Sequence, residues 1–214
     1  MRRVKQGPAS STLLLAGILS LGAGDAMAIE EPGYTVVEQA DDFELRLYEP
    51  YLVAETLVEG EFSEVGNEGF RRLAGYIFGK NRKDESIEMT APVNQAPGPE
   101  KISMTAPVSQ EVKSGMWRIT FTMPAGYTLE TLPVPLDDRI ILKQEPARLM
   151  AVIRYSGTWS RSRYQEKEAR LVSLIGERGL KTVGEPVFAR YNPPFTLWFL
   201  RRNEVLIQVE RSHD

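Results

Sequence analysis

Polar and apolar residues alternate with a period of two in several segments of the chain, most clearly in 43–47, 117–123 and 205–209. This alternation is typical of strands that are buried on one face. A large and mostly antiparallel sheet is therefore expected. The remaining segments that read as extended are 34–39, 51–58, 140–144, 148–155, 186–191 and 196–200.

Two stretches, about 62–78 and about 163–178, place apolar residues at helical spacing. In the second, Ser162 and Gln165 fit a capping box, and Gly176 and Gly179 supply the stop signal. The first is interrupted by glycines, each of which costs on the order of 1 kcal/mol relative to Ala. Glycines kept at that cost indicate that this helix approaches a neighbouring element closely on one face. They are Gly66, Gly69 and Gly75.

Each predicted helix is preceded by the same order of features: strand, Glu-Pro, strand, Gly, aromatic residue. Glu49-Pro50 recurs as Glu145-Pro146, and Gly60 as Gly157, at an offset of 96 or 97 residues. We interpret this as an internal duplication. The fold class expected is therefore α+β, with two pseudo-symmetric halves that each contribute one long helix and pack into one sheet or barrel.

A shorter repeat, Met-Thr-Ala-Pro-Val, occurs at 89–93 and again at 104–108, with a Pro-Gly turn between the copies. Proline cannot donate a hydrogen bond to a sheet ladder, so each copy is expected at a sheet edge or a bulge. The two copies are either paired edge strands with no further role or part of a functional feature.

Residues 1–28 read as a secretory signal peptide. Basic residues at 2, 3 and 5 precede an apolar run at 13–19, and Ala26-Met27-Ala28 resembles a cleavage site. The run is shorter than the roughly 20 residues that span a bilayer. A retained membrane anchor is the alternative. Cleavage leaves residues 29–214 as one domain, periplasmic or secreted, with no stable membrane anchor.

The cleaved chain carries 23 basic and 28 acidic residues, a net charge of −5, which gives no electrostatic case for binding nucleic acid. The chain contains no cysteine, so neither disulfides nor thiol chemistry contribute. Its one histidine, His213, lies next to the carboxyl terminus. Catalytic triads and ordinary zinc sites are therefore not expected, and no residue is expected to act in catalysis or to bind a metal.

The residues that remain suit a flat apolar ligand with acidic substituents. Arg71 and Arg72 adjoin the apolar Leu73 on the first helix, and Arg201 and Arg202 follow an aromatic stretch near the carboxyl end. Guanidinium groups hold carboxylates, and apolar walls bury a ring system. The alternative meaning of the second pair is a charged hairpin tip.

The chain resembles the SOUL haem-binding protein family over essentially all of 29–214. A doubled Met-Thr-Ala-Pro-Val followed by Arg-Arg-Asn-Glu in this order is specific to that family. The segments that carry the resemblance are 34–37, 43–48, 88–93, 102–108, 121–124, 132–135, 155–157, 191–195 and 201–204.

The resemblance implies a distorted antiparallel β-barrel, similar in plan to effector-binding domains. It also implies haem as a non-covalent cofactor in an apolar cleft between the first helix and the last hairpin. Because no histidine lies early in this chain, a histidine ligand to the iron is not expected. Carried over to this sequence, the binding residues are Arg71, Arg72, Leu73, Ile77, Tyr191, Arg201 and Arg202.

The function expected is an exported carrier or buffer for haem or another hydrophobic tetrapyrrole, acting as a monomer and without catalysis. Two other classes are kept open. A hydrolase-like enzyme on the same fold would need a buried carboxylate in the cleft. A small-molecule effector or interaction module would instead present an exposed apolar groove.

Overall fold

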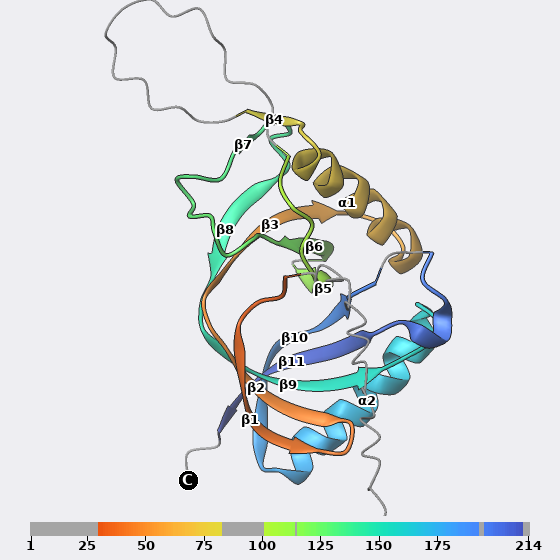
Figure 1. Ribbon diagram of the computed structural model, residues 1–214. Coiled ribbons are helices and arrows are strands. Elements are labelled where there is room, and N and C mark those ends of the chain that lie inside the picture. The colour runs from red at the N-terminus through yellow and green to blue at the C-terminus, as the bar shows by residue number, and fades with distance from the viewer. Residues whose placement is uncertain (1–29, 83–100, 114, 193–194, 212–214) are drawn as a thin grey trace, which may run out of the picture.

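The computed structural model describes residues 30–82, 101–113, 115–192 and 195–211 (Figure 1). Two helices and one 3-10 turn accompany the strands in these ranges: α1 (Phe62–Ile77), α2 (Arg161–Glu177) and η1 (Trp198–Leu200). The strands are β1 (Tyr34–Ala40), β2 (Phe43–Tyr48), β3 (Tyr51–Val58), β4 (Asn81–Arg82), β5 (Val108–Lys113), β6 (Met116–Thr122), β7 (Val134–Pro135), β8 (Ile141–Glu145), β9 (Arg148–Tyr155), β10 (Leu180–Arg190) and β11 (Asn203–Arg211).

Nine strands form one sheet in the order β1-β2-β9-β11-β10-β5-β6-β3-β8, and β4 pairs with β7 separately. All the pairings are antiparallel. With β1 set aside, β2-β9-β11-β10 from one end corresponds to β8-β3-β6-β5 from the other. The predicted α+β fold with two matching halves is confirmed. The internal duplication itself stays a prediction.

Chain continuity makes this sheet curl. β2 leads through Glu49-Pro50 into β3, although the two strands lie at opposite sides of the sheet. β8 leads through Glu145-Pro146 into β9 in the same way. The ladder resumes in register across both breaks, with Tyr48 opposite Arg148 and Tyr51 opposite Glu145. The expected distorted barrel is this strongly curled sheet, visible in Figure 1.

The helices lie on the outer face of the curl, one against each half (Figure 1). α1 packs on β3 and β6, where Leu73 and Ile77 are fully buried, and α2 packs on β9, β10 and β11 through Leu171 and Ile175. Alternate residues of the same strands face the inside of the curl. Successive side chains of each strand thus point alternately to the apolar core under the helices and to the inner face of the curl.

The glycines of α1 allow close packing, as their cost suggested. A Cβ placed on Gly69 would lie 2.4 Å from Cγ1 of Ile119 on β6. Real side chains do not approach so closely, so only a residue without a Cβ permits this spacing between helix and sheet.

The second helix begins two residues earlier than the capping box predicts. Ser160, with extended backbone, accepts a hydrogen bond from the backbone N–H of Arg163, so the prediction of Ser162 as the N-cap is wrong. Two serines here offer the same hydroxyl, and the extended chain that follows Trp159 places the earlier one at the helix end. Of the two predicted stop residues Gly179 is confirmed, because it adopts a φ of +63° just after the helix, whereas Gly176 lies within the last turn of α2.

Two expectations about extended segments change. The segment 196–200 is not a strand: it forms a turn and η1 in the loop between β10 and β11, because no strand lies beside it to pair with. In the second Met-Thr-Ala-Pro-Val copy, residues 104–107 are irregular and β5 begins at Val108. The first copy, like the signal-peptide segment and His213, lies outside the described residues.

Replacing Gly69 by Ala should lower the free energy of unfolding by about 2 kcal/mol, because the added methyl forces α1 away from Ile119. Gly176→Ala is the matched control: this exposed glycine of α2 has open space around its Cβ position, so its replacement should stabilise by about 1 kcal/mol. Urea denaturation of both variants measures the difference. Equal stability changes would contradict the close packing of α1.

Candidate functional site

A mainly apolar cleft of about 380 Å³ opens between α1, the segment that leads into β5, and the loop from β10 to β11. Its volume falls in the usual range for small-molecule sites, roughly 300–1,000 Å³. No carboxylate lines it among the residues that the structure describes. The lining residues are Gly66, Asn67, Phe70, Phe78, Met104, Thr105, Ala106, Val108, Gln110, Ile119, Trp159, Arg190, Tyr191, Asn192 and Phe195.

The helical wall owes its shape to spacing along α1. Gly66, Asn67 and Phe70 lie three and four residues apart and so share one side of the helix. A Cβ on Gly66 would be 3.2 Å from Oε1 of Gln110 and 3.4 Å from an amino nitrogen of Arg190. The missing side chain at this position therefore leaves room for two polar groups against the helix.

The floor of the cleft holds a fixed aromatic ring between two cations. Trp159 donates its indole N–H to Oδ1 of Asn203 over 2.7 Å, and Asn203 in turn donates to the carbonyl of Gly157. The guanidinium carbons of Arg190 and Arg201 lie 5.0 and 4.2 Å from the Trp159 ring centroid. This arrangement gives the cleft a rigid aromatic surface and a positive potential.

The rim of the cleft exposes large apolar side chains. Phe195 is 87% exposed and Trp198 is 57% exposed, and both belong to the loop between β10 and β11. Leu197, Phe199 and Leu200 of the same loop are also more than half exposed. Sequence reasoning had pointed to the aromatic stretch 191–195 but had assigned 196–200 to a strand, and so it missed the exposed side chains of that part of the loop. The adjacent Pro-Pro, which disfavours continued pairing, was the available signal.

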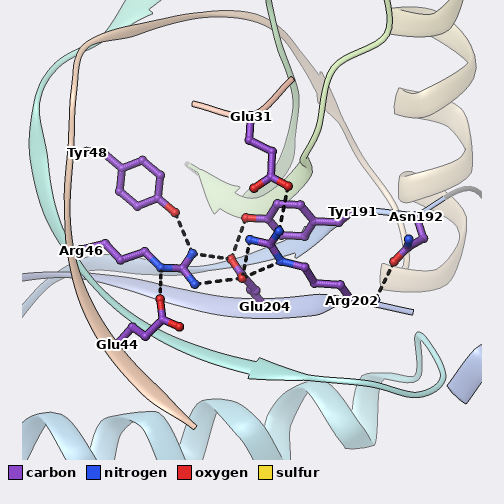
Figure 2. Close-up of polar contacts among 8 residues, drawn as sticks. All are labelled: Glu31, Glu44, Arg46, Tyr48, Tyr191, Asn192, Arg202 and Glu204. Carbon is purple, nitrogen blue, oxygen red and sulfur yellow. Dashed lines mark hydrogen bonds and ion pairs between the residues drawn. The ribbon is translucent and has the colours of Figure 1, made fainter. Parts of the chain in front are cut away.

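The inner face of the curl contains a buried ionic cluster around Glu204 (Figure 2). Arg46 on β2 donates two hydrogen bonds to the Glu204 carboxylate, over 2.8 and 3.0 Å. Tyr191 donates its hydroxyl over 2.6 Å, and Arg202 donates its Nε over 3.0 Å. Glu204 and Arg46 are essentially inaccessible to solvent. Strands β2 and β11 and the two ends of the loop between β10 and β11 thus meet at one carboxylate.

The electrostatics of the cluster favour charged forms despite burial. Burial alone raises the pKa of Glu204, but hydrogen bonds and charge from Arg46, followed by Arg202, outweigh it, so the pKa is lowered from 4.5. The pKa of the Tyr191 hydroxyl is raised well above its usual value, first by burial and then by the Glu204 charge. At neutral pH the cluster therefore contains an ionised glutamate and a neutral tyrosine.

A second ionic cluster occupies the matching position in the other half, and its central residue is a cation where Glu204 is an anion. Arg118 on β6 contacts Glu55, Glu111 and Glu145. Arg118 and Glu204 occupy corresponding places in the two halves. In the sheet, Arg118 lies opposite Leu57 of β3, and Glu204 lies opposite Arg154 of β9. Leu57 and Arg154 are 97 residues apart, which is the offset between the halves. The two halves share a backbone plan but carry inverse charges at their centres.

The space inside the curl is too small for an organic ligand. It measures about 30 Å³ and lies between the two ionic clusters, with Tyr191 of the first cluster and Arg118 and Glu145 of the second among its lining residues. A space of this size holds little more than ordered water, and it falls far below the roughly 300–1,000 Å³ of small-molecule sites. The buried carboxylates are therefore engaged in ion pairs around a nearly filled interior, on the other side of the sheet from the helices.

The structure disperses the seven residues expected to bind ligand. Tyr191 lines the cleft, and Arg201 lies next to it, over Trp159. Leu73 and Ile77 are buried in the core beneath α1. Arg72 turns toward β3, where it donates to Thr56 and to the carbonyl of Leu57. Whether any of the seven touches a ligand stays a prediction.

The two remaining arginines of that set also have intramolecular partners. Arg71 is exposed and donates to the carbonyl of Asn67. Arg202 stacks 3.8 Å from the Tyr191 ring centroid and pairs with Glu31 and Glu204. Helical spacing had located the correct helix but not which of its sides forms the cleft.

Within the described ranges, no cluster of three or more His, Cys, Asp or Glu side chains is arranged to hold a metal ion. Neither of the helices in these ranges is long and apolar enough to cross a membrane.

Comparison with known proteins decides the family. The model of the SOUL heme-binding protein family matches residues 29–208. The chain belongs to this family. Human heme-binding protein 2 is 30% identical over 193 residues, which cover 84% of this chain and 89% of that protein. Heme-binding protein 1 of Xenopus tropicalis is 25% identical over 169 residues, covering 75% of this chain and 84% of its own length.

Solved structures support the fold of this SOUL-family chain. The C-terminal domain of EcmrR superposes with a TM-score of 0.56 at 11% identity, covering 84% of this chain and 99% of that domain. A hydrolase from Listeria innocua gives a TM-score of 0.55 at 11% identity, covering 81% and 94%. At such low identity the likeness establishes the shared fold and nothing about function.

Replacing Glu204 by Gln should lower the free energy of unfolding at neutral pH by about 3 kcal/mol, because Arg46 and Arg202 lose their buried counter-charge. Glu210→Gln, at an exposed site on the same strand, is the control and should change stability by less than about 0.5 kcal/mol.

The same pair of variants gives a pH test. Folding lowers the pKa of Glu204 below 4.5, so its stabilisation is complete above about pH 4.5 and is lost as the pH falls through the folded pKa. The stability difference between the wild type and Glu204→Gln should therefore narrow on acidification. Chemical denaturation at a series of pH values measures it, and a difference that stays constant down to pH 2 would contradict the assignment.

Proposed function

We propose that this protein binds a tetrapyrrole such as haem, non-covalently, in the cleft between α1 and the loop from β10 to β11. The single observation that supports this most is the cleft itself: an apolar cavity of about 380 Å³ with an aromatic floor and arginines beside it. Membership of a family described by haem binding, and relatives named heme-binding proteins, point to the same ligand class.

The residues of the cleft fit a flat ring system better than they fit a tightly ligated iron. Phe70, Ile119 and Trp159 supply apolar and aromatic surface on which a macrocycle can pack. The thioether of Met104 is the one soft donor among the described lining residues, and methionine more often fills space than binds metal. We therefore propose hydrophobic binding with contacts to the acidic substituents and without a histidine ligand. When bound, haem would supply the iron for any redox chemistry.

Binding without catalysis is the role that these residues favour. A carboxylate in the cleft would favour an enzyme of this fold, and none lines it among the described residues. The buried carboxylates lie on the inner face and are ion-paired. We propose a carrier or buffer, acting as a monomer and without nucleic-acid contacts, in line with the net charge of −5 that remains after residues 1–28 are removed.

Export is the second part of the proposal. It rests on the basic, then apolar, then Ala-x-Ala pattern of residues 1–28. Mass spectrometry of the protein recovered from its native compartment tests it. We expect a chain that begins at Ile29 in the periplasmic or secreted fraction, and an intact amino terminus in the cytoplasmic fraction would contradict export.

Titration of the purified protein with haemin should produce a saturable change in the Soret band at micromolar concentration, with one ligand per chain. Asn67→Trp, which places a bulky ring on the cleft wall of α1, should weaken binding at least tenfold. Glu64→Trp adds the same ring to an exposed position of α1 that does not line the cleft, and it should bind as the wild type does.

Two results would overturn the proposal. One is the absence of any saturable spectral change with haemin or with metal-free protoporphyrin. The other is an equal effect of the two tryptophan variants, which would place the ligand elsewhere on the molecule.

A further inference from the structure

The cleft contains a partly buried cation that has no counter-ion among the residues that the structure describes. Arg190 lines the cavity, and its Nε is enclosed yet has no hydrogen-bond partner. Among the described residues, no carboxylate lies within ion-pair distance of its guanidinium. Other enclosed arginines of this chain are paired: Arg46 with Glu204, and Arg118 with three glutamates.

An unpaired charge in this position costs stability, so its presence calls for a physical reason. Burying an arginine away from acceptors forfeits its hydration, and the usual compensation is a carboxylate. Here burial first, and then the positive charge of Arg201, lower the pKa of Arg190 to about 10. The group therefore remains charged at neutral pH, held mainly by the rings of Trp159 and Phe188, whose centroids are both 5.0 Å from its guanidinium carbon.

The surroundings of Arg190 orient it and leave capacity for another acceptor. On one side its amino nitrogens lie close to Gly66 of α1, where the absence of a side chain keeps space open beside the guanidinium. The buried hydroxyl of Tyr155 likewise has no hydrogen-bond partner among the described residues. Burial raises the pKa of this hydroxyl, and the positive charge of Arg190 offsets part of that rise. Two enclosed donors in one region are thus unsatisfied within the protein.

We propose that Arg190 binds a carboxylate of the ligand inside the cleft, so that the cleft selects apolar acids over their neutral counterparts. This inference rests on the proposed function of the cleft as a ligand site and adds the charge of the ligand and the residue that recognises it. A guanidinium donates two parallel hydrogen bonds to a carboxylate, which stabilises the anion far more than a neutral ester. The apolar walls hold the rest of the molecule.

Two sources supply such chemistry: a porphyrin with propionate groups and a long-chain fatty acid. The test therefore uses two pairs of probes, protoporphyrin IX with its dimethyl ester and palmitate with its methyl ester. Fluorescence titration measures the porphyrins directly, and competition or calorimetry measures the lipids. The wild type should bind the acid of at least one pair about tenfold to a hundredfold more tightly than the ester, the range expected for a hydrogen bond to a charged group.

Arg190→Met keeps a long side chain, removes the charge and should abolish the preference for acid over ester. Arg190→Lys, which keeps the charge but not the two-pronged donor, should restore part of it. Arg154→Met is the matched control, because it removes an exposed arginine of the same sheet and should leave the preference unchanged. Thermal unfolding of each variant confirms that the compared proteins are folded.

The outcomes separate this inference from the function on which it rests. Equal binding of acid and ester by the wild type, or a preference that survives in Arg190→Met, overturns the role of Arg190 and leaves ligand binding intact. A preference confined to the lipid pair supports Arg190 and overturns the tetrapyrrole as the ligand. No binding of any of the four probes overturns the inference and the proposed function together.

Discussion

The buried carboxylate of Glu204 is the contact on which the arrangement of this protein most depends. It joins Arg46 on β2 to Tyr191 and Arg202, which flank the loop that forms one wall of the cleft. These contacts fix where the loop leaves and rejoins the sheet. The same tyrosine lines the cleft, so the inner cluster and the outer site share a residue.

The curl of the sheet separates two kinds of chemistry. Paired charges gather on its inner face around a space of about 30 Å³, and an apolar cavity about ten times larger lies on the face that carries the helices. The two halves use one backbone plan, yet Arg118 stands in one where Glu204 stands in the other. The matching halves are therefore not chemically equivalent, and the cleft beside α1 is built with residues that the other half does not supply.

Most strands and both helices could be predicted because their apolar periodicity reflects burial on one face. The side of the helix that forms the site could not be predicted, since Leu73 and Ile77 have the same spacing whether they face a core or a ligand. The role of Glu204 was equally hidden, because its partner Arg46 lies 158 residues away in sequence. Arg190 stood in a predicted strand, and nothing near it in sequence distinguishes an unpaired cation from a paired one.

The sequence pattern of 196–200 led to the wrong prediction of a strand for a related reason. Apolar and aromatic residues that favour strands do so when a partner strand is present, and here the chain turns away from the sheet. The exposed rings that result are a property of tertiary structure, not of the segment.

We propose that one ligand binds in the cleft beside Trp159, outside the curled sheet. A crystal structure of the protein with bound porphyrin tests this most directly. We expect one molecule per chain, packed between α1 and the loop from β10 to β11, with a carboxylate on Arg190. A ligand inside the curl, or two equivalent ligands related by the matching halves, would contradict it.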